Sequence, residues 1–121
     1  QADCGVFPAR AEGWNLELLE MMACGKAVIA TNYSAHTEFC NKDNAFLIDI
    51  DGLENAKDGV FFSGSHGEWA SLLEPQKEQL TEYMKSFHHM KSNGWVQNFA
   101  GTETANKFTW RNSVKELLNG L

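Results

Sequence analysis

Basic residues are scarce in this chain. Its 121 residues include 10 Lys and Arg against 16 Asp and Glu, which gives a formal net charge of −6 at pH 7. A nucleic-acid-binding surface needs clustered Lys and Arg, so this balance argues against a nucleic-acid partner. No apolar run approaches the length that spans a bilayer, and no signal peptide is visible. We therefore expect a cytoplasmic protein.

Cysteine and histidine patterns that bind metals or form disulfide frameworks are also missing. The three cysteines fall in predicted core elements: Cys4, Cys24 and Cys40. An odd number in such positions indicates reduced thiols. His36 and the pair His88-His89 lack a neighbouring Cys pair or a His-Glu-x-x-His pattern, so we expect solvated or capping histidines and no metal. The absence of Gly-x-Gly-x-x-Gly weakens an interpretation as a plain dinucleotide-binding domain.

Two carboxylates are the most informative residues that are present. Glu12 and Glu20 lie eight positions apart around a Gly-Trp-Asn turn, and an apolar helical run follows. A carboxylate inside so apolar a helix costs stability unless something pairs with it. This makes Glu20 a candidate ligand-binding residue. Glu12, at the mouth of the same turn, is a candidate for chemistry.

The elements around these carboxylates form a recognisable unit. Val6-Phe7-Pro8 is typical of the end of a short buried strand, because Pro suits a strand terminus. Asn15 is a predicted helix N-cap and Gly25 the predicted C-terminal cap of a mostly buried helix. The continuous apolar run 27–30 predicts a strand covered on both faces. Strand, helix and strand within about thirty residues make one βαβ unit and predict an α/β fold.

The rest of the sequence adds organisation. We expect a third parallel strand at 45–50 and a polar connection at 51–67. Within that connection Val60-Phe61-Phe62 is expected to form a short edge strand, or alternatively a hydrophobic plug against a neighbour. A helix is predicted from Pro75 to about Met90, and a last helix at roughly 102–118 with a break near 108–110. No repeat, low-complexity stretch or linker appears, so residues 1–121 are expected to form a single domain.

The geometry of a parallel sheet places the two carboxylates near a ligand site. Ligands bind outside the carboxyl ends of the strands, and the turn from Glu12 to Asn15 lies at such an end. Its backbone N–H groups predict an anion site, while Glu20 leans back toward the same crevice. A carboxylate suits a vicinal diol, so the residues suggest phosphate at the turn and sugar hydroxyls on Glu20. The alternative is a core polar network at Glu20 and a merely solvated Glu12.

Residues 8–31 resemble the donor-site segment of the retaining GT-B glycosyltransferases, most closely the large family 4, or "group 1". That family has Glu, seven residues and Glu, with Gly-Phe-Gly-Leu after the first Glu. Weaker likenesses follow at 33–39, 44–48 and 108–110. Three residues depart from the pattern: Trp14 replaces Phe, Asn15 replaces the second Gly, and Ala27 replaces Pro.

The resemblance implies a Rossmann-like parallel sheet with flanking helices, the C-terminal donor-binding part of such an enzyme without its N-terminal acceptor domain. Glu20 would bind the nucleotide ribose, and Glu12 would lie near the transferred sugar. Four residues would line the donor sugar and diphosphate, largely through their backbone N–H groups: Gly13, Trp14, Asn15 and Leu16. The implied donor is a nucleotide sugar such as a UDP- or GDP-sugar, used with retention and without a metal cofactor. The acceptor is not indicated, and the isolated chain is expected to be inactive.

A non-catalytic role is the alternative. An incomplete sheet leaves an unpaired edge, which proteins rarely tolerate exposed. A Rossmann-like module of this kind would act by nucleotide binding or by self-association through the incomplete sheet.

Overall fold

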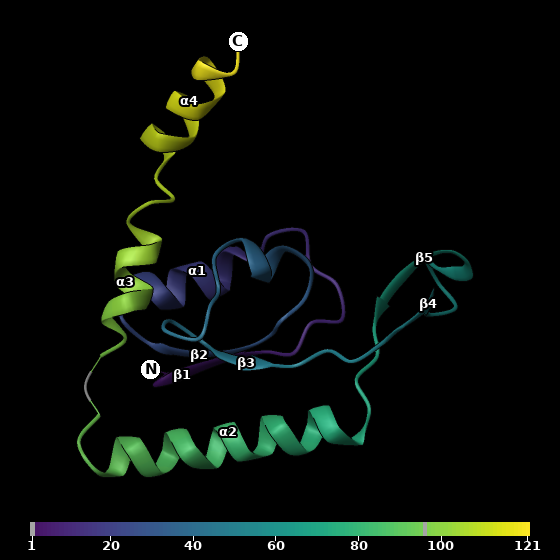
Figure 1. The fold of residues 1–121 in the computed structure, drawn as a ribbon, viewed down its shortest axis with the longest axis horizontal. Coiled ribbons are helices and arrows are strands. Elements are labelled where there is room, and N and C mark those ends of the chain that lie inside the picture. Colours follow the sequence, from purple (N-terminus) through teal and green to yellow (C-terminus); the bar gives the residue numbers. More distant parts are fainter. Residues whose placement is uncertain (1, 96) are drawn as a thin grey trace.

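The computed structural model of the protein describes residues 2–95 and 97–121. Its centre is a parallel sheet of three short strands in the order β1-β2-β3 (Figure 1). The strands are β1 (Cys4–Phe7), β2 (Ala27–Thr31) and β3 (Phe46–Ile48). Phe7 lies opposite Ala30, which in turn lies opposite Leu47, so all three strands end at the same edge. The predicted α/β fold and its parallel strands are confirmed.

Helix α1 (Leu16–Ala23) joins β1 to β2 and packs on one face of the sheet. Asn15 caps it as predicted, because its side-chain oxygen accepts a hydrogen bond from the Leu18 amide. Gly25, which follows the end of the helix, has a φ of 67°. The prediction of a mostly buried helix is wrong in part. Leu18, Leu19 and Met22 are buried, whereas Leu16 is 61% exposed and Ala23 is also exposed. The sheet and α3 cover only one side of α1, so its apolar residues divide between the core and the surface.

Every residue of β2 is buried, because the strand is central and covered on both faces. Helix α2 (Glu74–Ser92) covers the face opposite α1 (Figure 1). The Tyr83 hydroxyl on α2 donates to the Leu47 carbonyl oxygen at 3.0 Å, and its ring packs on Phe46. One expected core residue lies elsewhere: Cys24, just after α1, is exposed, whereas Cys40 is buried.

The connection after β3 differs from the prediction. It forms an antiparallel hairpin of β4 (Leu53–Lys57) and β5 (Ser63–Ala70), and Val60-Phe61-Phe62 lies at the exposed hairpin tip instead of in an edge strand. The side chain of Asp58 accepts hydrogen bonds from the amides of all three tip residues at 2.8–2.9 Å. Backbone pairing and this carboxylate hold the hairpin, so hydrophobic periodicity gave no signal of it.

Arg10 fixes the base of the hairpin beside the carboxyl end of β1. Its backbone oxygen accepts from the Ala70 amide at 2.7 Å, and its Nε donates to the Ala70 oxygen at 2.9 Å. Its guanidinium forms an ion pair with Glu54 and lies 4.3 Å from the centre of the Trp69 ring. The hairpin therefore borders the edge of the sheet at which the turn from Glu12 to Asn15 lies.

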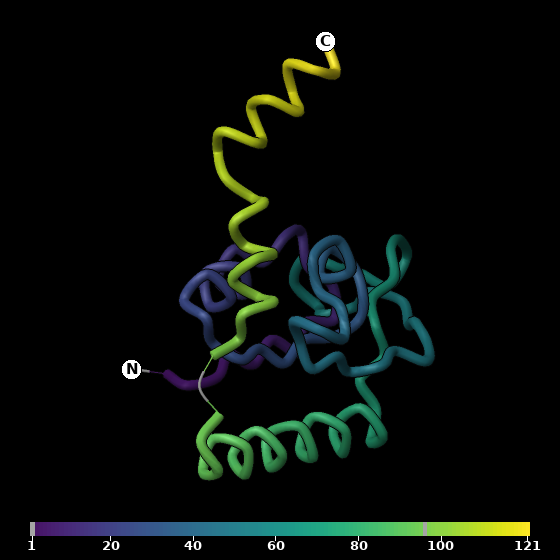
Figure 2. The backbone as a smooth tube through the Cα atoms, turned by 60° about the vertical axis from the view of Figure 1, so that its left-hand side comes forward, coloured from purple at the N-terminus to yellow at the C-terminus, as the bar shows by residue number. Residues whose placement is uncertain are grey.

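The chain ends in two helices, α3 (Phe99–Ala105) and α4 (Trp110–Asn119). The predicted break near 108–110 is confirmed, although α3 begins earlier than expected. Helix α3 packs on α1, whereas α4 extends away from the body and every residue from 106 to 121 is exposed (Figure 2). In the described ranges, no helix combines the length and the apolar character that a bilayer crossing requires.

Candidate functional site

The turn from Glu12 to Asn15 follows the carboxyl end of β1 and leads directly into α1. An open hollow of about 410 Å³ lies beside it. The hollow is lined by Phe7, Pro8, Ala9, Glu12, Asn15 and Glu17. Strand end and helix start thus form one surface, as the topology predicts for a ligand site in a parallel sheet.

Glu12 is half-buried and its backbone is held from two sides by one side chain. The Ser34 hydroxyl donates to the Glu12 carbonyl oxygen at 2.8 Å, and the Glu12 amide donates to the same hydroxyl at 3.2 Å. The Glu12 carboxylate folds back and accepts from the Gly13 amide at 3.0 Å. In this state the carboxylate occupies one of the backbone N–H groups that are expected to bind phosphate.

Asn15 is buried and closes the turn. It adopts a φ of 72°, the left-handed region that Asn tolerates better than most residues. After it, the amides of Leu16 and Glu17 donate to no acceptor within the described ranges. Such free donors at the positive end of a helix dipole are suited to an anion.

The side chain of Trp14 lies away from the hollow. Its ring centre is 5.2 Å from that of Phe39 and 5.4 Å from that of Phe108, so the three rings form an aromatic cluster. Trp14 therefore offers only its backbone groups to a ligand at the turn. Phe108 comes from the segment after α3, so this part of the chain also supports the turn.

Glu20 is exposed, and the argument that this carboxylate is buried is wrong. Its carboxylate makes no hydrogen bond or ion pair with any described residue, and Glu20 does not line the hollow beside Glu12. Because α1 buries Leu18, Leu19 and Met22, it turns Glu20 outward together with Leu16, four positions earlier. Glu20 is accessible to a ligand, but the structure shows no contact that joins it to Glu12.

Two polar residues that support the turn were missed from the sequence. His36, expected to be solvated or capping, is fully buried, and its Nε2 lies 2.8 Å from the Asn15 side-chain nitrogen. Ser34 holds Glu12 as described above. Both follow β2 on the 3₁₀ helix η1 (Ser34–Glu38), and the carboxyl ends of β1 and β2 lie side by side. That adjacency was the available signal, because a loop after β2 must pass beside the turn after β1.

The hollow beside Glu12 is acidic. Two carboxylates line it, from Glu12 and Glu17, and no Lys or Arg is among its lining residues. Glu17 lies in the first turn of α1, where its negative charge also complements the helix dipole. The arrangement offers acceptors for hydroxyl groups and two helix-terminal amides for an anion. Over the described ranges, no three His, Cys, Asp or Glu side chains are grouped so as to hold a metal ion.

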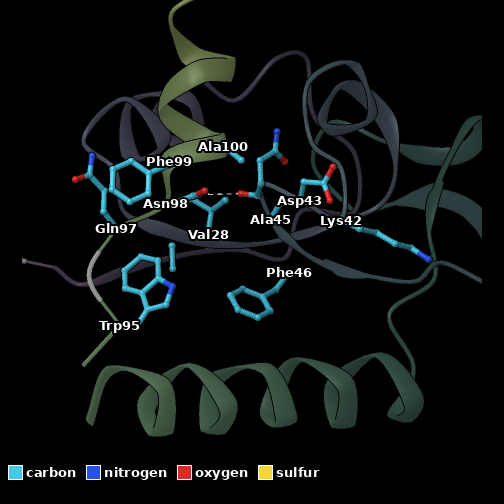
Figure 3. Close-up of a pocket in the computed structure, with 12 residues that line it drawn as sticks. Val28, Lys42, Asp43, Ala45, Phe46, Trp95, Gln97, Asn98, Phe99 and Ala100 are labelled. Atoms are coloured by element: carbon cyan, nitrogen blue, oxygen red, sulfur yellow. Dashed lines mark hydrogen bonds between the residues drawn. The ribbon is translucent and has the colours of Figure 1, made fainter. Parts of the chain in front are cut away.

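A second hollow of about 220 Å³ lies at the opposite end of the strands (Figure 3). The start of β2 and β3, Lys42 and Asp43, and the aromatic rings of Trp95 and Phe99 line it. Since ligands of open parallel sheets bind at the carboxyl ends of the strands, the hollow beside Glu12 is the better candidate site.

Comparison with known proteins gives one family match. Residues 1–60 match the family model described as glycosyl transferases group 1. This range contains the whole parallel sheet, α1, the turn and η1, while α2, α3, α4 and β5 lie outside it. A search of curated proteins and a search of solved structures gave no match.

Proposed function

Because residues 1–60 belong to the group 1 glycosyltransferases, we propose that this chain forms the donor-binding side of a retaining glycosyltransferase. The donor is a nucleotide sugar, such as a UDP- or GDP-sugar, and residues 1–121 act as one domain. One observation carries the proposal: the turn from Glu12 to Asn15 lies at the carboxyl end of β1, beside an open hollow and the start of α1.

The diphosphate of the donor binds at the start of α1. The amides of Leu16 and Glu17 are free to donate there, and the helix dipole favours an anion. The Gly13 amide joins them when the Glu12 carboxylate moves from it to a sugar hydroxyl. Asn15 holds these amides in place by capping the helix.

The two carboxylates have separate roles. Glu12 lies beside the transferred sugar, where its charge stabilises the positive charge that develops as the glycosidic bond breaks. Glu20 accepts hydrogen bonds from the ribose hydroxyls. The exposed Leu16 lies one helical turn before Glu20 on the same face and gives the nucleoside an apolar surface.

Transfer requires more than this chain provides. A diphosphate brings negative charge to a hollow whose lining has two carboxylates and no basic residue. Unless a basic group comes from elsewhere, that charge stays uncompensated, so the isolated chain binds donor weakly and transfers no sugar. The proposal places the protein in a reducing, cytoplasmic environment, since all three cysteines are free.

Calorimetric titration with nucleotide sugars and with free nucleoside diphosphates tests these roles. Glu20→Gln should weaken both ligands by about tenfold or more, because it removes a charged hydrogen-bond acceptor from the ribose. Glu12→Gln should weaken binding of the nucleotide sugar but not of the nucleoside diphosphate, because it removes the charged acceptor beside the sugar and also removes a negative charge near the diphosphate. The matched control is Glu78→Gln on the exposed face of α2, which should change neither. Equal affinities for all four proteins would contradict the assignment.

Self-association is the second candidate function. Helix α4 exposes a row of apolar side chains, and the outer edge of β1 has no partner strand among the described residues. The row consists of Trp110, Val114, Leu117, Leu118 and Leu121. Light scattering over a dilution series tests this role; a monomer at every concentration would count against it.

A further inference from the structure

The segment that follows β2 holds the turn at both of its ends. Ser34 contacts the backbone of Glu12 at 2.8 and 3.2 Å, and His36 contacts the side chain of Asn15 at 2.8 Å. The first contact fixes the start of the turn, and the second fixes its end, where α1 begins. The shape of the candidate site therefore depends on a loop whose residues do not line the hollow.

The neighbours of His36 determine which ring nitrogen carries the hydrogen. Nδ1 lies 3.0 Å from the Thr31 carbonyl oxygen, which can only accept, so the hydrogen is on Nδ1. The Thr31 hydroxyl donates its own hydrogen to the Ala9 oxygen at 2.6 Å and is thus a second acceptor, 3.3 Å from Nδ1. Nε2 is then free to accept a hydrogen bond from the Asn15 side-chain amide.

This bond decides how the Asn15 amide is oriented. With its nitrogen directed to His36, its oxygen faces the Leu18 amide at 3.1 Å and closes the first turn of α1. Asn15 needs this support, because a φ of 72° is strained for a residue with a side chain. Glycine, which the related motif has at this position, would adopt the conformation without help.

We propose that His36, in the tautomer with its hydrogen on Nδ1, is a positioning residue for the donor-binding turn and acts through Asn15. It touches no ligand itself. The consequence for affinity rests on the proposed function, whereas the consequence for the turn does not.

Two matched variants separate the two sides of the imidazole ring. In His36→Gln the amide oxygen takes the place of Nε2, which keeps the acceptor for Asn15 and loses the donor to Thr31. In His36→Asn the amide nitrogen takes the place of Nδ1, which keeps the donor and loses the acceptor. Both variants leave part of the ring volume empty, so a merely structural role predicts the same behaviour for the two.

The first readout needs no ligand. Hydrogen exchange at the Leu18 amide should stay close to the wild-type rate in His36→Gln and become faster in His36→Asn. Ring-nitrogen chemical shifts of the wild-type protein should show the hydrogen on Nδ1. Equal Leu18 exchange in the two variants, or a hydrogen found on Nε2, would overturn the proposal.

The second readout is affinity for a UDP-sugar or GDP-sugar, whichever the wild-type protein binds. We expect His36→Gln to bind within about twofold of wild type and His36→Asn to bind up to about tenfold more weakly, the range of one neutral hydrogen bond. The reverse order would contradict the role of His36. A wild-type protein that binds neither donor defeats the proposed function, and Leu18 exchange then decides the positioning role alone.

Discussion

At the residue scale, differences in burial make the three cysteine thiols differ in reactivity. Burial raises the pKa of the Cys40 thiol to about 12 and that of Cys4 to about 11. A thiol that stays protonated is a poor nucleophile, and Cys40 is also shielded from solvent. Cys24 is exposed, so the three free cysteines differ in reactivity although they look alike in the sequence.

Alkylation tests this difference. With iodoacetamide near pH 8, Cys24 should be modified first and Cys40 only after the protein is denatured, because Cys40 is protonated and inaccessible. Mass spectrometry of the digested protein locates each adduct, and Cys24→Ser should abolish the fast reaction. Rapid modification of Cys40 in the native protein would show that solvent reaches this thiol, and would contradict its burial.

The same burial predicts a loss of stability in alkaline solution. The folded pKa of Cys40 is raised from 9.0, so the unfolded thiol ionises first as the pH rises. The free energy of unfolding should therefore fall between about pH 9 and pH 12, and be unaffected by this group below pH 9. Urea unfolding at several pH values measures the slope. Cys40→Ala should reduce it; an unchanged slope would exclude Cys40 as the cause.

At the scale of elements, α1 divides its leucines between core and surface. Leu18 is 0% exposed and Leu16 is 61% exposed, on the same helix and two positions apart. Leu18→Ala should lower the free energy of unfolding by about 2–5 kcal/mol, since it leaves a cavity in the core. Leu16→Ala should lower it by less than about 0.5 kcal/mol. Chemical denaturation of the two variants checks this, and similar losses would contradict the placement of α1.

The hairpin tip depends on one carboxylate. Hydrogen bonds from the backbone of Phe62, then of Val60 and Phe61, lower the pKa of Asp58 from its usual value of 3.8. The hairpin tip should therefore stay ordered in mild acid. It should lose this order only as the pH falls through the lowered pKa of Asp58. Asp58→Ala should speed hydrogen exchange at the three tip amides at neutral pH. Asp58→Asn, which keeps an acceptor oxygen, should retain part of the protection.

The central elements could be predicted from the sequence because each has a local signal. The apolar run of β2, the Asn15 cap, the end of α1 just before Gly25 and the break before Trp110 are confirmed. The hairpin could not be predicted, since backbone bonds and Asp58 hold it and its polar residues show no alternation. The surroundings of Glu20 were also misjudged, because composition does not reveal which side of a helix its neighbours cover.

The candidate site could be predicted only in part, because only some of its features have a local sequence signal. The turn beside Glu12 follows from strand and helix order, which the sequence indicates. The support from Ser34 and His36 needs the register of β1 against β2, which no local pattern gives. Whether Glu12 and Glu20 have the roles inferred from the resemblance stays a prediction.

At the scale of the whole molecule, α4 is separate from the core. Its residues are all exposed, whereas Phe108 just before it packs on Trp14. A chain that ends at Thr109 should keep its free energy of unfolding within about 0.5 kcal/mol, because no buried contact is removed. Thermal and urea unfolding measure this. A large loss of stability would show that α4 packs on the body in solution.

The most direct test of the central claim is a residue-by-residue map of donor binding. Amide spectra of the isotope-labelled chain are recorded during titration with UDP- and GDP-sugars. We expect chemical-shift changes at the turn and the start of α1, from Gly13 to Glu20, and unchanged amides at Trp95 and Phe99 in the second hollow. Changes confined to the second hollow, or no changes with any nucleotide sugar, would contradict the central claim.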